Sequence, residues 1–428
     1  MTIFLLLFIG VILFTTFHGK SDFFHPTRIY ILLYAMLFAV YFLRLCRIQD
    51  RWSSTTTMLF WGAVICFVGV GALVTFYIKH LTPGSAELIN TRRVTSRLSQ
   101  LETTIDWNWF TFITSLVCMF FVGSYIYAYL RWGVIPMTSD NPNEDRFLFL
   151  AGNIIMGMAG GSGPVVMMLC AELLFVRQTT RKQKTAAVLM MLVSFSLYFT
   201  LVTRMPLVRS CIYIGVLYHY FKKQISFKVI LFFAFLAILF FVFGSVVRAD
   251  ITKFSELASS LRIHVPAKYL LFVNPYAYAV NNVWNMDYGF KKFIDGLHEY
   301  HISHGFEMLR GLFYFLHIET PLQVAYHFDS LYNESIVKVS GLNSVIYIWH
   351  FYKDFGILGL FIVSLFFSSI IHLFYYNTLI LPSHYRITIY GCIVSMIVFS
   401  FMIPLWSFWN LYYEIAILTI SHKSLKII

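Results

Sequence analysis

Residues 58–78, MLFWGAVICFVGVGALVTFYI, decide the fold class, because the stretch contains no charged residue over 21 positions. A helix of about 20 apolar residues crosses the hydrocarbon core of a bilayer. In lipid, every backbone polar group of a spanning segment must find its partner within a helix or a closed barrel. The stretch therefore predicts a membrane-spanning α-helix.

The composition of the whole 428-residue chain extends this prediction, since 59% of the residues are hydrophobic and 12% are charged. Soluble domains carry about 25% charged residues. These values exclude a soluble enzyme, a disordered chain and a coiled coil. The net charge of +12 is expected to reflect cationic loops on the cytoplasmic side of a membrane, so no nucleic-acid partner is predicted.

We predict an all-α fold, a polytopic membrane protein with about eleven transmembrane helices. The first predicted span lacks a basic n-region and a small-residue cleavage site, so it is interpreted as a helix and not as a signal peptide. The predicted spans are residues 2–17, 29–45, 58–78, 110–130, 154–176, 186–203, 205–221, 229–247, 354–376, 387–404 and 405–420.

The chain is expected to form a single membrane domain in three parts: N-terminal transmembrane helices (1–247), a large loop (248–353) and C-terminal transmembrane helices (354–428). The Lys and Arg residues favour an outside N-terminus, which places the loop outside. Loops longer than about 12–15 residues without structure of their own are usually functional or disordered. Helix-like stretches at Gly289–His298 and Phe306–Phe315 predict an ordered, partly helical cap.

Arginines gather at the predicted outer ends of the spans, and charges near a membrane are functional candidates. A guanidinium holds phosphate oxygens in a bidentate fork, so the group predicts a phosphate site at the outer leaflet. Simple anchoring of helix ends in lipid headgroups is the alternative. The five are Arg131, Arg146, Arg204, Arg209 and Arg248.

Within this pattern, the segment Arg204-Met-Pro-Leu-Val-Arg209 gives the most specific indication of a site. Pro206 suits the first turn of a helix. The positive end of that helix, with its free backbone N–H groups, would lie between two arginines. The segment therefore predicts an anion site.

Three other features leave alternatives open. Glu414 is expected to pair with an arginine, act as a base or make a buried polar contact; Glu172 is interpreted as interfacial. The run Gly157–Pro164 lacks a GK[ST] ending and follows no strand, so it predicts close helix packing or a broken helix and not a phosphate loop.

His298, His301 and His304 could share one helical face, but no Cys, Asp or Glu stands at ligand spacing, so surface or general-base roles are favoured over a metal. No metal site and no cofactor are predicted. Asp354 is interpreted either as a helix cap or as a side chain that orients an arginine or a sugar hydroxyl.

Four motifs follow one another along the chain: Asp22-Phe-Phe-His-Pro26, Gly133-Val-Ile-Pro136 followed by Arg146, Thr203-Arg204-Met-Pro, and Asn343 followed by Asp354-Phe-Gly356 and Gly359. In this order they resemble the Wzy-type O-antigen and oligosaccharide repeat-unit polymerases, over roughly residues 20–376. A Thr often expected shortly after Asn343 is replaced here by Ile346 or Tyr347.

The resemblance implies a fold similar to the GT-C membrane glycosyltransferases and a site that faces the periplasm from the bacterial inner membrane. It implies transfer of a growing chain from undecaprenyl pyrophosphate to the next lipid-linked repeat unit. The expected partners are that lipid-linked oligosaccharide, membrane lipid and a chain-length regulator protein.

The roles that follow are hypotheses about the same residues. Arg204, Arg209 and Arg248 would hold the donor pyrophosphate, with Arg131 and Arg146 assisting, and His301, His304 or an outer carboxylate would act as base. Further substrate contacts would come from Asn343, Tyr352 and Asp354.

Three other functions are kept as alternatives. An O-antigen ligase would share the architecture and the donor but use a different acceptor. A lipid-linked-sugar flippase or transporter would be expected to show internal repeats and charges near the midplane, of which the sequence shows few. A membrane acyltransferase would rely on His350 or His372, a poor match.

Overall fold

The structure is a computed structural model in which every element among the described residues is helical. This confirms the predicted all-α class for that part of the chain. The described residues are 22–47, 49–81, 91–102, 105–142, 154–201, 203–226, 251–263, 266–296, 302–316, 344–402 and 404–423, with isolated positions at 145, 146, 149, 229, 232, 235, 239, 242, 318 and 336.

The chain divides into two compact units, each built from separate stretches of sequence. Unit 1 comprises Met1–Pro83, Ile251–Tyr375 and Met396–Trp409, and unit 2 comprises Gly84–Asp250, Tyr376–Ser395 and Asn410–Ile428. Most of the predicted 248–353 loop therefore belongs to unit 1 and does not form a unit of its own.

Unit 1 begins with α2 and α3 and continues with the helices of the long loop. Its elements are α2 (Pro26–Phe42), α3 (Ser54–Leu81), α12 (Ile251–Ser260), the 3₁₀ turn η3 (Ala267–Phe272), α13 (Val273–Phe290), the π-helical turn η4 (Lys291–Asp295), α14 (Phe306–Phe315), the greater part of α17 (Tyr347–Ile380) and η5 (Leu405–Ser407). Helix α14 coincides with the predicted stretch Phe306–Phe315, and α13 with η4 covers Gly289 to Asp295 of the other.

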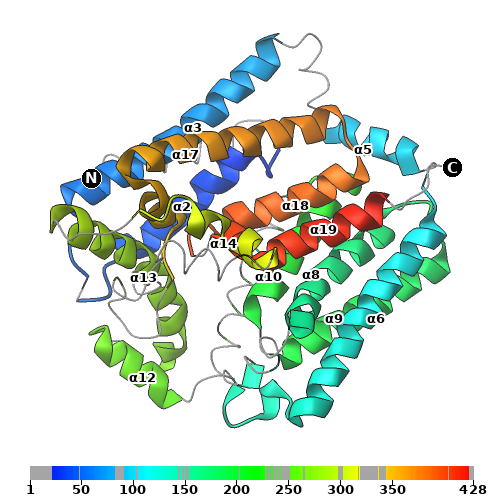
Figure 1. Cartoon of the computed structure of the whole chain (residues 1–428), viewed down its shortest axis with the longest axis horizontal. Coiled ribbons are helices and arrows are strands. Elements are labelled where there is room, and N and C mark those ends of the chain that lie inside the picture. The colour runs from blue at the N-terminus through cyan, green and yellow to red at the C-terminus, as the bar shows by residue number, and fades with distance from the viewer. Residues whose placement is uncertain are drawn as a thin grey trace. The chain divides into compact units, whose positions relative to one another are not determined.

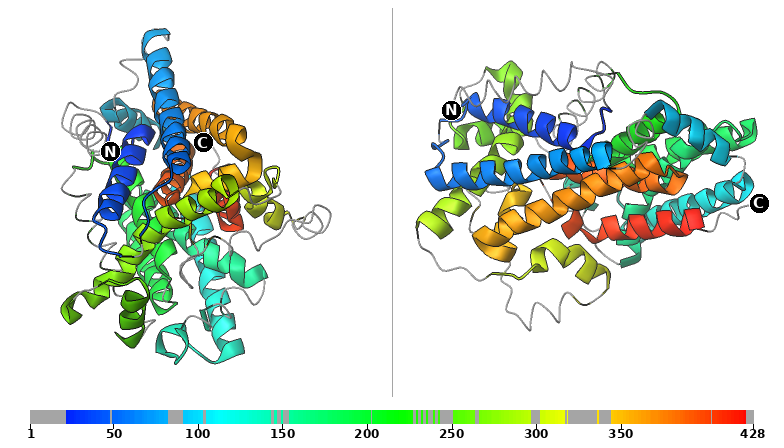
Figure 2. Two further views of the ribbon diagram at one scale, coloured as in Figure 1. Left: turned by 90° about the vertical axis from the view of Figure 1, so that its left-hand side faces the viewer. Right: turned by 90° about the horizontal axis from the view of Figure 1, so that it is seen from above.

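Within unit 1, α3 and α17 lie side by side (Figures 1 and 2). The hydroxyl of Ser368 donates to the carbonyl of Phe67 at 2.7 Å, and Gly71 leaves room for the ring of His372. A Cβ at Gly71 would lie 2.5 Å from His372 Nε2, so the close approach of the two helices requires glycine there.

Helix α17 is interrupted at Gly356, whose φ of 69° and ψ of −167° are not helical. A positive φ is strained for residues with a Cβ, and glycine adopts it readily. The segment Asp354-Phe-Gly356 is therefore a break in a long helix.

Unit 2 is arranged around α8, which packs against α6, α9 and α10. Its elements are α5 (Thr91–Leu101), α6 (Trp107–Trp132), the turn η2 (Pro136–Thr138), α8 (Ile154–Phe175), α9 (Arg181–Thr200), α10 (Arg204–Phe221), most of α18 (His384–Phe399) and α19 (Trp409–Lys423). Figure 1 shows α6, α8 and α9 as neighbours in this unit.

The Gly157–Pro164 run lies within α8, which is continuous as far as Phe175. Gly163 faces the ring of Tyr198 so closely that a Cβ would overlap it. Pro164 lacks the N–H that would reach the carbonyl of Gly160 four residues earlier, and the hydroxyl of Tyr198 donates to that carbonyl instead. Close helix packing is thus confirmed for this run, and the helix is not broken.

Three described helices are long and apolar enough to cross a membrane: Ser54–His80 of α3, Trp107–Trp132 and Tyr347–Ile380. They indicate a membrane protein. The predicted number of about eleven spans is not confirmed. Among the described residues, the further apolar helices Pro26–Phe42, Gly160–Phe175 and His384–Phe399 are shorter than a span requires. Helix α2 has 17 residues and α19 has 15, and α9 begins with Arg181, Lys182 and Lys184. Residues 2–17 and most of 229–247 lie outside the described residues.

Candidate functional site

Helix α10 begins at Arg204, with Pro206 in its first turn, as the sequence predicted. A proline is tolerated there because the first N–H groups of a helix have no partner within it. Thr203 occupies the N-cap position without capping the helix through its side chain. Its hydroxyl is buried and has no hydrogen-bond partner among the described residues.

A single hydrophobic cluster in unit 2 joins the segments that carry three of the predicted arginines. It contains Phe149, three residues after Arg146, and Leu201 and Leu207, on either side of Arg204. Trp132 packs against the same cluster, and the guanidinium of Arg131 lies 5.1 Å from the ring of that tryptophan. The structure therefore brings the segments of Arg131, Arg146 and Arg204 to the start of α10.

Arg209 is 3% exposed and forms a buried ion pair with Glu414 of α19. Its guanidinium also donates to the hydroxyl of Tyr213 at 2.6 Å, and Tyr213 donates to the same carboxylate at 2.9 Å. Of the alternatives for Glu414, the structure shows pairing with an arginine.

This network leaves two polar atoms in need of a partner. Arg209 Nε and Glu414 Oε1 are buried and have no hydrogen-bond partner among the described residues. Buried polar atoms are costly unless protein, water or a ligand satisfies them. An anion at the start of α10 would therefore have to compete with Glu414 before Arg209 could bind it.

Unit 1 holds the candidate residues of the Asp354 segment. The carboxylate of Asp354 is fully buried and accepts hydrogen bonds from the backbone N–H of Glu307 at 3.0 Å and of Met308 at 2.7 Å. The hydroxyl of Ser303 donates to it at 2.5 Å. Asp354 is thus a helix cap, as one alternative predicted, but for α14 and not for its own helix.

The other candidates of unit 1 differ in exposure. Tyr352 is 3% exposed and contacts the rings of Phe290 and Trp349. His304 is exposed and has a positive φ of 49°, directly before Gly305 at the start of α14. The remaining candidates, Arg248, His301 and Asn343, lie outside the described residues, as does His298.

Beside Asp354, Lys353 and Glu307 form a second buried ion pair, with Nζ 2.7 Å from Oε1. Burial raises the pKa of Glu307, but the ammonium of Lys353, together with nearby His350 and Arg310, outweighs burial and holds the pKa below its usual value. Nothing local in the sequence links these two residues, because their contact spans 46 positions.

Sequence reasoning missed several groups that the structure places in these networks: the hydroxyls of Thr203 and Tyr213, and the side chains of Ser303, Glu307 and Lys353. For Thr203, its N-cap position before Arg204 was a usable signal. Among the described residues, no group of three or more His, Cys, Asp or Glu side chains is placed to hold a metal ion.

Comparison with known proteins gives no relative. No protein-family model matches the chain, no curated protein matches it, and no solved structure is similar to it. The function therefore has to be argued from the residues and their geometry.

Proposed function

We propose that the chain is a glycosyltransferase of the bacterial inner membrane that joins undecaprenyl-pyrophosphate-linked oligosaccharide repeat units at the periplasmic face. The observation that carries the proposal is the start of α10. There, Arg204 lies at the positive end of an 18-residue helix, beside a Thr203 hydroxyl that has no partner among the described residues. One apolar cluster brings the segments of Arg131 and Arg146 to the same place.

The chemistry needs positive charge where a pyrophosphate leaves. The bond between the anomeric carbon of the donor saccharide and the pyrophosphate oxygen breaks, and a glycosidic bond to an acceptor hydroxyl forms. The lipid pyrophosphate departs with the electron pair, and a base takes the hydroxyl proton. The backbone N–H groups of α10 and the guanidinium of Arg204 would stabilise the departing charge.

Arg209 would add to this site only when its pair with Glu414 opens, since both charges are buried in contact with each other. Arg248, His301 and Asn343 keep their proposed roles in donor binding, proton transfer and substrate contact. His304 is the exposed candidate base among the described residues of this group, next to the capped start of α14.

The test is a purified chain in lipid nanodiscs, supplied with one lipid-linked repeat unit and examined for a ladder of longer products. We expect Arg204→Ala to slow elongation about 100-fold or more, the usual effect of removing one transition-state donor. Arg204→Lys should retain part of the rate, because lysine keeps the positive charge. It should not restore the full rate, because an ammonium cannot bind two phosphate oxygens in the bidentate geometry of a guanidinium. Arg181→Ala, an exposed arginine at the start of α9, is the matched control.

An unchanged ladder in Arg204→Ala would overturn the assignment of the anion site. Transfer of the saccharide to lipid A-core, with no ladder on lipid-linked repeats, would show a ligase instead.

A transporter of the same lipid-linked saccharide is the second candidate, and the buried Arg209–Glu414 pair favours it. Ionisable side chains inside membrane helices often mark transport pathways. Movement of a fluorescent lipid-linked saccharide across vesicles without elongation would support this function over the first.

A further inference from the structure

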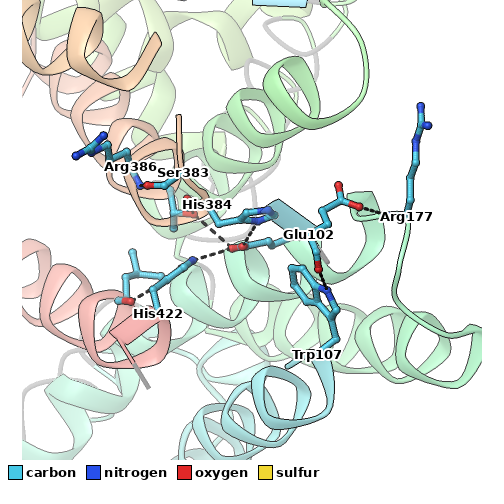
Figure 3. Close-up of polar contacts among 10 residues, drawn as sticks. Glu102, Trp107, Arg177, Ser383, His384, Arg386 and His422 are labelled. Atoms are coloured by element: carbon cyan, nitrogen blue, oxygen red, sulfur yellow. Dashed lines mark hydrogen bonds and ion pairs between the residues drawn. The ribbon is translucent and has the colours of Figure 1, made fainter. Parts of the chain in front are cut away.

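A second buried cluster of ionisable side chains lies in unit 2, apart from the start of α10. The carboxylate of Glu172 on α8 is fully buried between two histidines. His384 Nδ1 lies 2.7 Å from Oε1, and His422 Nε2 lies 3.1 Å from Oε2. Figure 3 shows the imidazoles of His384 and His422 directed at one point between them.

Aromatic rings from several helices surround the cluster and shield it from water. His384 stacks on Phe221 at 4.8 Å between ring centroids and meets Trp107 at 5.5 Å. His422 meets Phe110 at 5.6 Å and Tyr385 at 5.8 Å. Because water is kept from the carboxylate, its charge has to be balanced within the cluster.

The hydrogen bonds fix the number of protons. His422 Nδ1 lies 2.8 Å from the carbonyl oxygen of Leu418, and its Nε2 faces Glu172, so both ring nitrogens face acceptors. With Glu172 ionised, both ring nitrogens donate, which makes His422 a cation. His384 Nδ1 lies at hydrogen-bond distance from the same carboxylate, and its buried Nε2 has no partner among the described residues. The charge of an ionised Glu172 is therefore balanced by His422.

Other charged groups lie around the cluster, and two of them have hydrogen-bond partners outside it. Glu102 accepts the backbone N–H of Arg177 at 2.9 Å, and Arg386 donates to the carbonyl of Leu381 at 2.5 Å. Lys222, at the end of α10, has a pKa lowered by partial burial and by nearby Lys184 and Arg177, while Glu102 opposes this shift. Lys423 follows His422 in the chain, and the hydroxyl of Tyr385 bonds Thr419 at 3.1 Å.

Helix α19 connects this cluster to the candidate site. His422 lies eight residues after Glu414, or about 12 Å along the helix. Glu414 holds Arg209 of α10, while His422 holds Glu172 of α8. Two charged contacts therefore hold helix α19, one at Glu414 and one at His422. A change at either contact can shift the helix and alter the other contact.

We propose that Glu172, His384 and His422 form a buried proton-binding site that holds α19 in its position. The position of α19 in turn controls whether the ion pair between Glu414 and Arg209 stays closed. The regulatory part of this proposal rests on the proposed function of the arginine site. When Glu172 and His422 share one proton, the carboxylate of Glu172 contacts both His384 and His422. Loss of the His422 proton at high pH leaves the carboxylate without its cation, and a second proton at low pH enters a site that offers it no acceptor.

The proton site is tested without reference to activity, by hydrogen exchange of the backbone of α19 in the wild-type chain at about pH 5.5, 7 and 8.5, corrected for the intrinsic rate. We expect protection to be greatest near neutrality and to fall about tenfold or more on either side, the effect of losing one charge-assisted hydrogen bond. Protection that does not vary with pH would overturn the proposal.

His422→Gln keeps a hydrogen-bond donor but cannot become charged, so the pH dependence of exchange in α19 should disappear in this variant. His80→Gln changes an exposed histidine at the end of α3 and should leave it intact. A pH dependence that persists in His422→Gln would contradict the assignment. The same samples are then assayed for the product ladder: pH-dependent exchange without any ladder would reject the proposed function alone, and a ladder without pH-dependent exchange would reject the proton site alone.

Discussion

The ammonium of Lys353 on α17 lies 2.7 Å from the carboxylate of Glu307 on α14, and both side chains are almost wholly buried. Next to this pair, the carboxylate of Asp354 caps the same short helix. Two consecutive residues of α17 therefore hold α14, one through an ion pair and one through backbone hydrogen bonds.

Replacing one partner of the pair should cost far more than replacing both. Lys353→Met leaves the buried Glu307 carboxylate without its cation, which costs about 3–5 kcal/mol in comparable sites. The double variant Lys353→Met/Glu307→Gln should recover most of this loss. Thermal unfolding in detergent checks the prediction, and equal losses in the single and double variants would contradict it.

The same pair makes stability depend on acid. Because the pKa of Glu307 in the folded chain lies below its usual value of about 4.5, ionised Glu307 stabilises the fold above that pH. This contribution is lost as the pH falls below about 4.5 and through the folded pKa. Hydrogen exchange of α14 between about pH 6 and 3 should show a larger loss in the wild type than in the double variant, which keeps Asp354 but lacks the ion pair.

Asp354→Ala should loosen the start of α14. The variant removes the acceptor of two backbone N–H groups, and loss of a helix cap costs about 1–2 kcal/mol. Exchange of Glu307 and Met308 should accelerate, while exchange of unit 2 stays unchanged. Asp140→Ala, at an exposed aspartate, serves as the control. Equal exchange in both variants would show that the cap contributes nothing.

Pro164 and Tyr198 should be energetically coupled. In the wild type, Tyr198 donates to the Gly160 carbonyl that Pro164 leaves without a helical partner. Tyr198→Phe should cost about 1–3 kcal/mol, the penalty of an unsatisfied buried acceptor. In a Pro164→Ala background the helix supplies its own N–H, so the same change should cost less. A double-mutant cycle of unfolding free energies measures the difference, and additive effects would refute the coupling.

Local signals in the sequence predicted local structure well. Pro206 marked the start of α10, and the apolar runs 58–78 and 110–130 lie inside α3 and α6. The predicted number of about eleven spans stays unconfirmed. Hydropathy alone does not separate a helix buried against other helices from one that faces lipid, because both are apolar.

Pairings between distant positions could not be predicted. Glu172 looked interfacial because its partners, His384 and His422, are more than 200 positions away. A helix cap was one of the two alternatives for Asp354, but the identity of the capped helix depends on how the long loop folds back on α17.

The break at Gly356 has a consequence for depth in the bilayer. It divides α17 so that His350, Lys353 and Asp354 all precede it, while residues 357–380 contain no Asp, Glu, Lys or Arg. Those later residues extend about 36 Å as a helix, enough to cross a hydrocarbon core of about 30 Å. We therefore expect Gly356 to lie near the level at which this helix would pass from the headgroups into the acyl chains of a membrane.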